Sequence, residues 1–161
     1  MKILVVSDTH GYNSLMWKVI EKEKPFDLLL HCGDLEGDPD IVFGRLSDAV
    51  LTVSGNNDYA YGMRSMISFP IGRRKAIMVH GHRHHVYSDL SSLCYLAEEN
   101  GADTVFFGHL HVPIAVCEGG ITLLNPGSLT YPRQKGRKPT YMIVNTDDEG
   151  GLEYEVKEVE E

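Results

Sequence analysis

The apolar positions in the first third of the chain follow two different periods. Three short apolar runs predict buried strands at Lys2–Val6, Asp27–Cys32 and Ala49–Val53. Between these runs, apolar residues recur at helical spacing. They are Leu15, Met16, Val19 and Ile20 in the first segment, and Ile41, Val42 and Leu46 in the second. A strand–helix–strand–helix–strand order predicts a parallel sheet with right-handed crossovers.

The predicted helices have recognisable ends. Asn13 or Ser14 can cap the first helix, and Pro25 ends it. Asp38 can cap the second helix, which opens with Pro39 at a position where proline is well tolerated. Both helices are therefore short and connect neighbouring strands.

The remainder of the chain is richer in strands. Ala76–His80 and Thr104–Phe107 are predicted strands on either side of a third helix, which Ser88 can cap and Asn100-Gly101 closes. Its inward-facing residues are predicted to be Leu90, Leu93, Cys94, Leu96 and Ala97. Two hairpins follow, Val112–Cys117 with Ile121–Leu124 and Tyr141–Thr146 with Leu152–Val159. A final hairpin after βαβ units suggests a second sheet packed on the first.

Composition limits the class of protein. A chain of 161 residues with 42% hydrophobic and 24% charged residues is expected to form one globular domain over residues 1–161. No apolar run approaches the roughly 20 residues that span a bilayer, and the N-terminal run is too short for a secretion signal. Three cysteines without CxxC spacing, Cys32, Cys94 and Cys117, argue for a reducing compartment. The expected location is the cytoplasm.

The net charge of −8 is unevenly distributed. Residues 147–161 contain eight acids and one base, whereas residues 1–146 are nearly neutral. The acidic end is expected to be a solvated strand and terminus. Binding to duplex nucleic acid is not expected, because such binding needs clustered lysine and arginine.

Residues that can bind a metal ion follow each predicted buried strand. The five segments are Asp8-Thr9-His10, Gly33-Asp34, Gly55-Asn56-Asn57-Asp58, His80-Gly81-His82 and Gly108-His109-Leu110-His111. The carboxyl ends of parallel strands share one edge of a sheet, where open α/β folds place their ligands. We therefore expect these five segments to meet. The glycines beside them allow sharp turns and close approach.

The candidate ligands outnumber the needs of a single ion. They are Asp8, His10, Asp34, Asn56, His80, His109 and His111. Carboxylate, amide and imidazole groups without a thiolate favour divalent ions such as Mn²⁺, Fe²⁺, Ni²⁺ or Zn²⁺. Two ions that share a bridging carboxylate would use all seven ligands. Two metals roughly 3.5–4 Å apart are the usual device for in-line displacement at phosphorus.

These five segments resemble the motifs of the calcineurin-like metallophosphoesterases, which are D-x-H, G-D, G-N-x-[DE], a histidine with a nearby G-H, and G-H-x-H. Asn125-Pro126-Gly127-Ser128, followed by Pro132-Arg133, is similar to the signature of the small YfcE-type phosphodiesterase branch. The resemblance implies an α/β fold. Specifically, it implies a four-layer sandwich of two facing mixed β-sheets flanked by helices.

The resemblance also implies an assignment of the ligands. One ion would be held by Asp8, His10 and His111, and Asp34 would bridge the two ions. The second ion would be held by Asn56, His80 and His109. A water or hydroxide between the ions would be the nucleophile. Mn²⁺ is the expected ion, with Ni²⁺, Fe²⁺ and Zn²⁺ as alternatives, and the branch implies a homodimer or larger homo-oligomer.

Asn57 departs from the wider superfamily, in which many members carry a histidine that protonates the leaving oxygen. An amide cannot transfer that proton, so the branch resemblance and Asn57 both favour small phosphodiesters with good leaving groups. Asp58 is expected to orient Asn56 or the backbone of its loop. His82 is a candidate to face the substrate, and Arg133 to neutralise phosphate oxygens or to form a surface salt bridge.

Three more histidines and two alternative functions remain to be considered. His31 fits either strand packing or the orientation of a ligand, and His84 and His85 are expected in a solvated loop. A scaffold of the same fold, like the retromer subunit, would act through protein contacts rather than catalysis. A scaffold need not retain every imidazole, yet all seven ligand positions carry competent donors here. A phosphomonoesterase is the third reading, and Asn57 argues against it.

Overall fold

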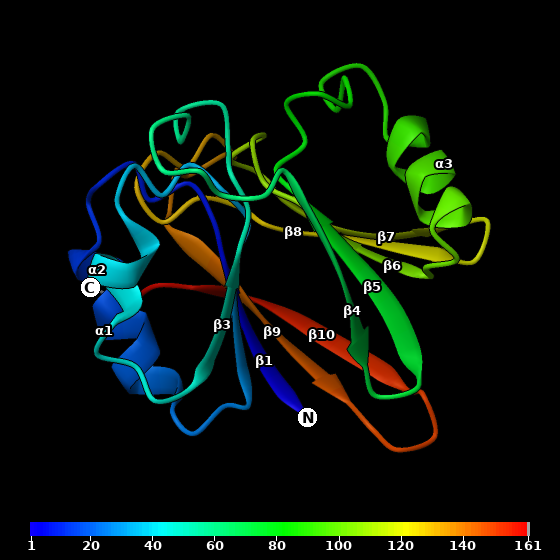
Figure 1. Cartoon of the computed structure of the whole chain (residues 1–161), viewed down its shortest axis with the longest axis horizontal. Helices are drawn as coiled ribbons and strands as arrows, with labels where there is room; N and C mark the ends of the chain where they lie inside the picture. Colours follow the sequence, from blue (N-terminus) through cyan, green and yellow to red (C-terminus); the bar gives the residue numbers. More distant parts are fainter. Residues whose placement is uncertain (161) are drawn as a thin grey trace.

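In the computed structural model, which describes residues 1–160, two five-stranded sheets face each other (Figure 1). The order in the first sheet is β10 (Leu152–Glu158), β9 (Thr140–Thr146), β1 (Lys2–Val6), β2 (Leu28–His31) and β3 (Ala49–Thr52). The order in the second is β4 (Met66–Ile71), β5 (Arg74–Val79), β6 (Thr104–Phe106), β8 (Ile121–Pro126) and β7 (Pro113–Glu118). Both sheets are mixed. In the first, β1, β2 and β3 are parallel, and β9 and β10 add antiparallel pairings on one side. In the second, the parallel strands β5, β6 and β8 lie between the antiparallel edge strands β4 and β7.

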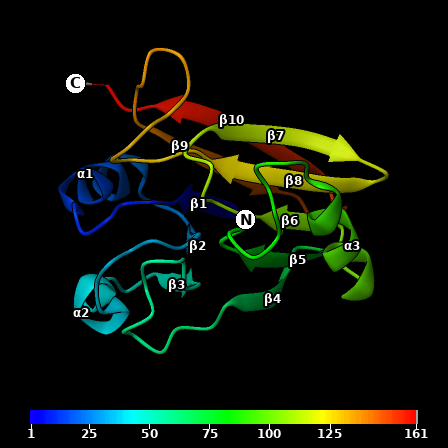
Figure 2. The ribbon, with the colours of Figure 1, turned by 90° about the horizontal axis from the view of Figure 1, so that it is seen from above.

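Three helices cover the outer faces of the sandwich. Helices α1 (Ser14–Glu23) and α2 (Pro39–Phe43) lie on the first sheet, and α3 (Ser91–Glu99) lies on the second (Figure 2). The resulting order of layers is helix, sheet, sheet, helix. This confirms the α/β fold class and the four-layer sandwich expected from the motifs.

Strand β1 shows how the sequence builds these layers. Ile3 and Val5 point toward the second sheet and share a buried cluster with Phe106. Leu4 and Val6 point the other way, into the cluster beneath the first two helices. These four side chains of β1 are fully buried, and each contributes about 1.5–3 kcal/mol of hydrophobic free energy. A strand buried on both faces must be apolar throughout, which explains the unbroken apolar run.

The parallel strands direct the functional loops to one edge of the sandwich. Strands β1, β2 and β3 are mutually parallel, as are β5 and β6. The loops that follow these strands gather at the top of the molecule in Figure 1. The ligand-bearing edge was predicted for one sheet. In the structure, the two facing sheets both contribute to it.

Two sheet assignments differ from the prediction. The final hairpin, β9 and β10, does not belong to the second sheet, because β9 pairs with β1 and extends the first. Strand β4 was not predicted, since Pro70 interrupts its pattern. Proline is tolerated there because β4 is an edge strand, where an amide hydrogen is dispensable.

Two helix details also differ. Helix α2 ends at Phe43, so Leu46 lies beyond it, and Ile41 is 78% exposed rather than buried. A helix of this length faces the sheet with only part of its surface, so some of its apolar side chains remain exposed to solvent. Helix α3 begins at Ser91, whose amide donates to the Asp89 carboxylate at 2.9 Å, so the cap is not provided by Ser88.

The acidic C-terminal segment forms β10, an edge strand whose side chains are mostly exposed, as expected. Among residues 1–160, no helix combines the length and apolar character needed to cross a bilayer.

Candidate metal centre

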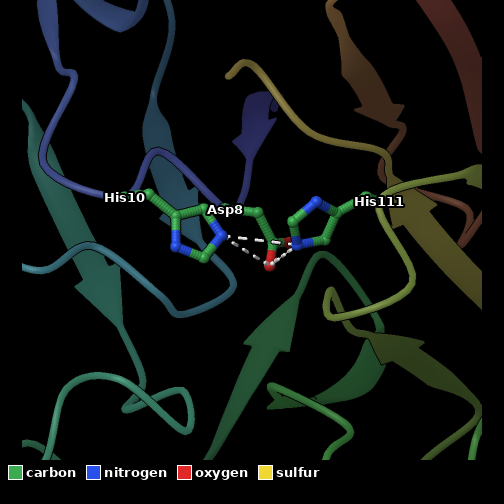
Figure 3. Close-up of side chains that lie close together, drawn as sticks. All are labelled: Asp8, His10 and His111. Carbon is green, nitrogen blue, oxygen red and sulfur yellow. Dashed lines mark hydrogen bonds and ion pairs between the residues drawn. The ribbon is translucent and has the colours of Figure 1, made fainter. Parts of the chain in front are cut away.

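Asp8, His10 and His111 converge on one point although 101 residues separate the last two (Figure 3). The Asp8 Oδ1 atom lies 3.0 Å from His111 Nε2 and 3.9 Å from His10 Nε2. The two Nε2 atoms are 3.3 Å apart. Ligand atoms bound to one ion at about 2.0–2.2 Å lie at separations of this size. The three groups can therefore hold one cation.

A second group shares Asp8 with the first. Its other members are Asp34 and His80, whose Oδ2 and Nε2 atoms are 3.5 Å apart, and all three ligand atoms lie within 4.8 Å of one another. Asp34 Oδ2 is also 3.8 Å from His10 Nε2, a member of the first group. Asp34 therefore faces both groups, as a bridging carboxylate must.

The polar atoms at the centre lack the partners that burial demands. Asp8 Oδ1 and His80 Nε2 are buried without a hydrogen bond among the described residues. Asp8 Oδ2, in contrast, accepts from Ser7 Oγ at 2.6 Å and from the His109 amide at 3.1 Å. A buried acceptor without a partner is costly unless a proton or a cation lies against it. The donor set thus fits divalent cations.

Hydrogen bonds at the far nitrogen fix the orientation of three histidines. His80 Nδ1 donates to the Cys32 carbonyl at 2.7 Å, and His111 Nδ1 donates to the Tyr131 carbonyl at 2.8 Å. His10 Nδ1 donates to Glu36 Oε1 at 2.6 Å. A neutral imidazole that donates from Nδ1 presents a lone pair at Nε2. All three Nε2 lone pairs thereby face the centre, as in metal-binding histidines.

Electrostatics at the centre favour charged carboxylates. Burial raises the pKa of Asp8, but His111 and His80 lower it by more, so the net pKa lies below the ordinary value. Burial likewise raises the pKa of Asp34, but the nearby His80 imidazole and the hydrogen bonds from Asn57 lower it by more, so the net pKa lies below the ordinary value. For His109, burial and the nearby His80 lower the pKa to about 4, which keeps the imidazole neutral and able to bind a metal.

Five of the seven predicted ligands belong to the two ligand groups, and His109 lies beside them. The ring of His109 lies 5.0 Å from that of His80, centroid to centroid. Asn56 is exposed, and within residues 1–160 its side chain has no hydrogen bond to another ligand. Its role as a ligand therefore stays a prediction.

Asn57 and Asp58 brace the loop that carries Asp34. The Asn57 amide and side chain donate to the two Asp34 oxygens at 2.9 and 2.8 Å. Asp58 is buried, and its carboxylate accepts from the amides of Gly55, Leu35 and Glu36 at 2.8, 3.2 and 2.7 Å. Asp58 thus joins the loop after β3 to the loop after β2.

His31 supports the centre from inside the sheet. Its Nε2 atom is 3.1 Å from Thr9 Oγ1, and its Nδ1 atom accepts from the Gly33 amide at 3.3 Å. Burial is the main cause that lowers its pKa to about 4, so the ring is neutral. His31 is fully buried and packs within the strand, and its contacts also connect it with the loops that carry Asp8 and Asp34.

His82 and Arg133 lie at the margins of the centre. The ring of His82 is 5.4 Å from that of His80, and it lines a cavity of about 450 Å³ together with Asn56. Arg133 Nη1 donates to the hydroxyl of Tyr87, which donates to the His109 carbonyl at 3.2 Å. Within the described chain, Arg133 forms no salt bridge, so the alternative role considered for it is not observed.

One supporting residue was not predicted from the sequence, and two others belong to a motif whose structural role was not predicted. Glu36 orients His10, and Asn125 and Ser128 bind backbone carbonyls of Gly108 and Asp8 at 2.7 and 2.8 Å. The Asn-Pro-Gly-Ser turn therefore ties together ligand loops from both sheets. Glu36 follows Asp34 by two residues, and this proximity is the only sequence signal for it.

Close packing explains the glycine at position 55. A Cβ atom there would lie 2.1 Å from Asp34 Oδ1 and 2.4 Å from the Asp34 amide nitrogen. Contacts so short are not found between real atoms, so any side chain at this position would displace Asp34. The glycine is required for the approach of the two loops.

Comparison with known proteins agrees with this geometry. Residues 1–149 match the model of the calcineurin-like phosphoesterase superfamily domain. The probable metallophosphoesterase YsnB of Bacillus subtilis is 32% identical over 92% of this chain and 86% of its own. The phosphodiesterase YfcE of Escherichia coli K12 is 27% identical over 91% and 89%.

A solved structure shows the same fold. The crystal structure of a predicted phosphoesterase from Streptococcus pneumoniae TIGR4 superimposes with a TM-score of 0.86 at 33% identity, and covers 98% of this chain and 88% of that one. The chain belongs to the calcineurin-like phosphoesterase superfamily.

Proposed function

We propose that this protein is a divalent-metal-dependent phosphodiesterase with two ions at the candidate centre. The observation that carries the proposal is the pair of ligand groups sharing Asp8, whose Oδ1 atom is buried and unpartnered. Two bound divalent ions would supply a hydroxide nucleophile at neutral pH and would neutralise charge on the phosphoryl oxygens. The relative named phosphodiesterase YfcE supports the choice of ester.

The residues divide between two ions as the motifs imply. Asp8, His10 and His111 form the first set, which the distances of 3.0–3.9 Å support. Asn56, His80 and His109 form the second set, supported by the contact between the two imidazole rings. Asp34 bridges the sets, because its Oδ2 atom lies between His10 and His80.

Other side chains set the class of substrate. The Asn57 side chain holds Asp34 by a hydrogen bond, and its amide is too weak an acid to protonate a leaving group. The leaving group must therefore depart without a general acid at this position. Diesters with stabilised leaving groups meet this condition best. Arg133 is placed beside His109 by Tyr87 and neutralises a phosphate oxygen, and His82 contacts the substrate from the opposite cavity.

The same proposal includes Mn²⁺ as the ion, with Ni²⁺, Fe²⁺ or Zn²⁺ as alternatives, because the ligands are carboxylate, amide and imidazole. It also includes a cytoplasmic location and a homodimer or larger homo-oligomer. Light scattering on the purified protein measures the oligomeric state directly, and a monomeric mass would contradict that part.

A scaffold that acts through protein contacts is the alternative function. The buried, unpartnered ligand atoms disfavour it, because a protein without bound metal gains nothing from leaving Asp8 Oδ1 and His80 Nε2 unsatisfied. A phosphomonoesterase is disfavoured by the amide at position 57.

The decisive experiment measures hydrolysis after chelation and after return of each metal. Bis(p-nitrophenyl) phosphate, p-nitrophenyl phosphate and alkyl phosphate esters serve as substrates. We expect Mn²⁺ to restore cleavage of the diester, and the diester to be preferred over both monoesters. Asp34→Asn should abolish most of this activity, whereas the exposed His85→Ala, in a neighbouring loop, should retain it. Full activity in the chelated protein, or a preference for monoesters, would refute the proposal.

A further inference from the structure

The loop that joins β8 to β9 has a charge opposite to that of the protein. Between Glu118 and Asp147 the chain has four basic residues and no acidic one, although the net charge of the whole chain is −8. All four lie within six positions of that loop. They are Arg133, Lys135, Arg137 and Lys138.

Most of this positive charge is not neutralised by the protein. Lys138 pairs with Glu158 at 2.6 Å. Arg133, Lys135 and Arg137 form no ion pair with any residue in the described range 1–160, and all three are exposed. Among residues 1–160, the Arg133 side chain donates one hydrogen bond, to the neutral hydroxyl of Tyr87. Uncompensated cations grouped on an acidic protein indicate an anionic ligand.

Two of these cations, Arg133 and Arg137, line a hollow that adjoins the metal centre. A cavity of about 450 Å³, here called the basic cavity, is lined by Thr130, Tyr131, Pro132, Arg133 and Arg137. Two contacts connect it with the ligands of the first ion. The Arg133 amide donates to the His111 carbonyl at 2.9 Å, and the Tyr131 ring lies 5.2 Å from that of His10. A molecule bound at the metal centre would thus reach the basic cavity directly.

We propose that the basic cavity is a second anion-binding subsite, which holds a phosphate group carried by one of the alcohol substituents of the substrate. The inference rests on the proposed phosphodiesterase function and narrows it. A simple diester has a single negative charge, which the metal centre and Arg133 already neutralise. The guanidinium group of Arg137 matches a further phosphate, because it can donate two parallel hydrogen bonds to it. The substrate class is therefore a phosphodiester with an additional terminal phosphate, such as the phosphorylated end of a short oligonucleotide.

The test compares thymidine dinucleotides that differ only in a terminal phosphate. The kcat/KM for TpT is measured beside those for pTpT and TpTp, with the Mn²⁺-loaded full chain. We expect at least one phosphorylated dinucleotide to be preferred about fivefold or more, and added salt to weaken the preference. Arg137→Gln removes one charge and should reduce the ratio toward one. Arg45→Gln, an exposed arginine in the loop before β3, is the matched control and should leave the ratio unchanged.

A binding measurement separates this inference from the function on which it rests. Calorimetry with chelated protein records binding of TpT, pTpT and TpTp without turnover. Tighter binding of a phosphorylated form, lost in Arg137→Gln, would support the subsite independently of catalysis. Hydrolysis of all three dinucleotides with equal kcat/KM would overturn the subsite and leave the phosphodiesterase standing. Failure to hydrolyse any diester in protein with full metal content would overturn the function itself.

Discussion

Several residues of the centre adopt a backbone conformation that side chains usually avoid. Asp8, His10, Asp34, His109 and His111 have φ angles between 47° and 67°, the left-handed region. Each such non-glycine residue costs on the order of 1 kcal/mol. Five of them at one sheet edge mark a functional site, because only the convergence of their side chains explains the shared strain.

The contact between Asn57 and Asp34 gives a first prediction at this scale. Asn57→Ala removes the 2.8 Å hydrogen bond that holds Asp34 Oδ2 toward the centre. We expect the affinity for Mn²⁺ to fall about tenfold, the lower end of the effect of residues that orient metal ligands. Calorimetric titration of the chelated protein measures it. Asn145→Ala, which removes an exposed amide on β9, should bind Mn²⁺ like the wild type, and equal affinity in both variants would contradict the brace.

Asp58 gives a second prediction, on stability. Its carboxylate accepts three backbone hydrogen bonds, and Asp58→Asn would turn an amide donor toward at least one of these donors. We expect the free energy of unfolding to fall by about 2–3 kcal/mol. Urea unfolding of chelated protein measures the change without a contribution from metal. Asp148→Asn alters an exposed carboxylate and should differ from the wild type by less than about 0.5 kcal/mol.

The sequence predicted the candidate ligands but not all of the residues that support them. Asp8, His10 and Asp34 stand out because chemistry-bearing residues directly follow apolar runs. Glu36 does not, because its contact with His10 exists only once both loops have turned into the left-handed region. Backbone conformations of this kind are set by tertiary packing, and no local pattern reports them.

Among the elements, the end of α1 is tied to three strands by one buried carboxylate. Glu23 Oε1 accepts from the Tyr141 hydroxyl on β9 at 2.7 Å and from Lys157 on β10 at 3.2 Å. Glu23 Oε2 pairs with Lys2 on β1 at 3.3 Å. The side chain is only 7% exposed, so these partners replace its water. The cluster fastens the first helix to its sheet.

This cluster predicts a pH dependence of stability. Burial raises the pKa of Glu23. Hydrogen bonds from Tyr141, Lys157 and Lys2 lower it by a larger amount, so the net pKa is below 4.5. A lowered pKa contributes stability above the unfolded-state value, and this contribution is lost as the pH falls through the folded-state value. Glu23→Gln should therefore reduce the free energy of unfolding by about 1–2 kcal/mol at pH 7.

The difference in the free energy of unfolding between the wild type and Glu23→Gln should shrink below pH 4.5, where the wild-type carboxylate takes up its proton. Urea unfolding across pH 3–7 follows both proteins. Glu21→Gln removes a carboxylate from the exposed part of the same helix and serves as the control. A constant difference at every pH would show that the ionised form of Glu23 does not matter.

The order of helices and strands could be predicted from the sequence, whereas the pairing of strands within the sheets could not. The hydrophobic pattern located the strands that carry the ligands, because each contains an apolar run that is followed by a polar motif. The pairing of β9 with β1 joins residues about 140 positions apart, and no local signal specifies it. Strand β4 was not predicted because Pro70 interrupts its short alternation of apolar and polar residues.

At the scale of the whole molecule, the centre spans the junction of two sheets. Asp8 and Asp34 follow strands of the first sheet, and His80 and His109 follow strands of the second. Neither sheet alone carries a complete set of ligands. Because the ligands converge only when the sheets are packed together, ions that bind the centre bind the folded protein and not the unfolded chain.

The last prediction follows from this coupling. Ligands specific to the folded state stabilise it by RT ln(1 + [L]/Kd), about 2.7 kcal/mol per site at a concentration one hundred times Kd. Two occupied sites should therefore raise the midpoint of thermal unfolding by roughly 10–20 °C for a chain of this size. Metal analysis should give about two Mn²⁺ per chain.

The geometry distinguishes the two sites in the same experiment. In the proposed assignment Asp34 contacts both ions, whereas His111 contacts one. Asp34→Asn should therefore remove most of the rise in unfolding temperature that Mn²⁺ causes, and His111→Ala should remove about half of it. The rise is measured for each variant against its own chelated form, so a loss of intrinsic stability does not enter the comparison. Equal losses in both variants would show that the ions bind only together, and no rise in the wild type would refute a metal centre shared by the two sheets.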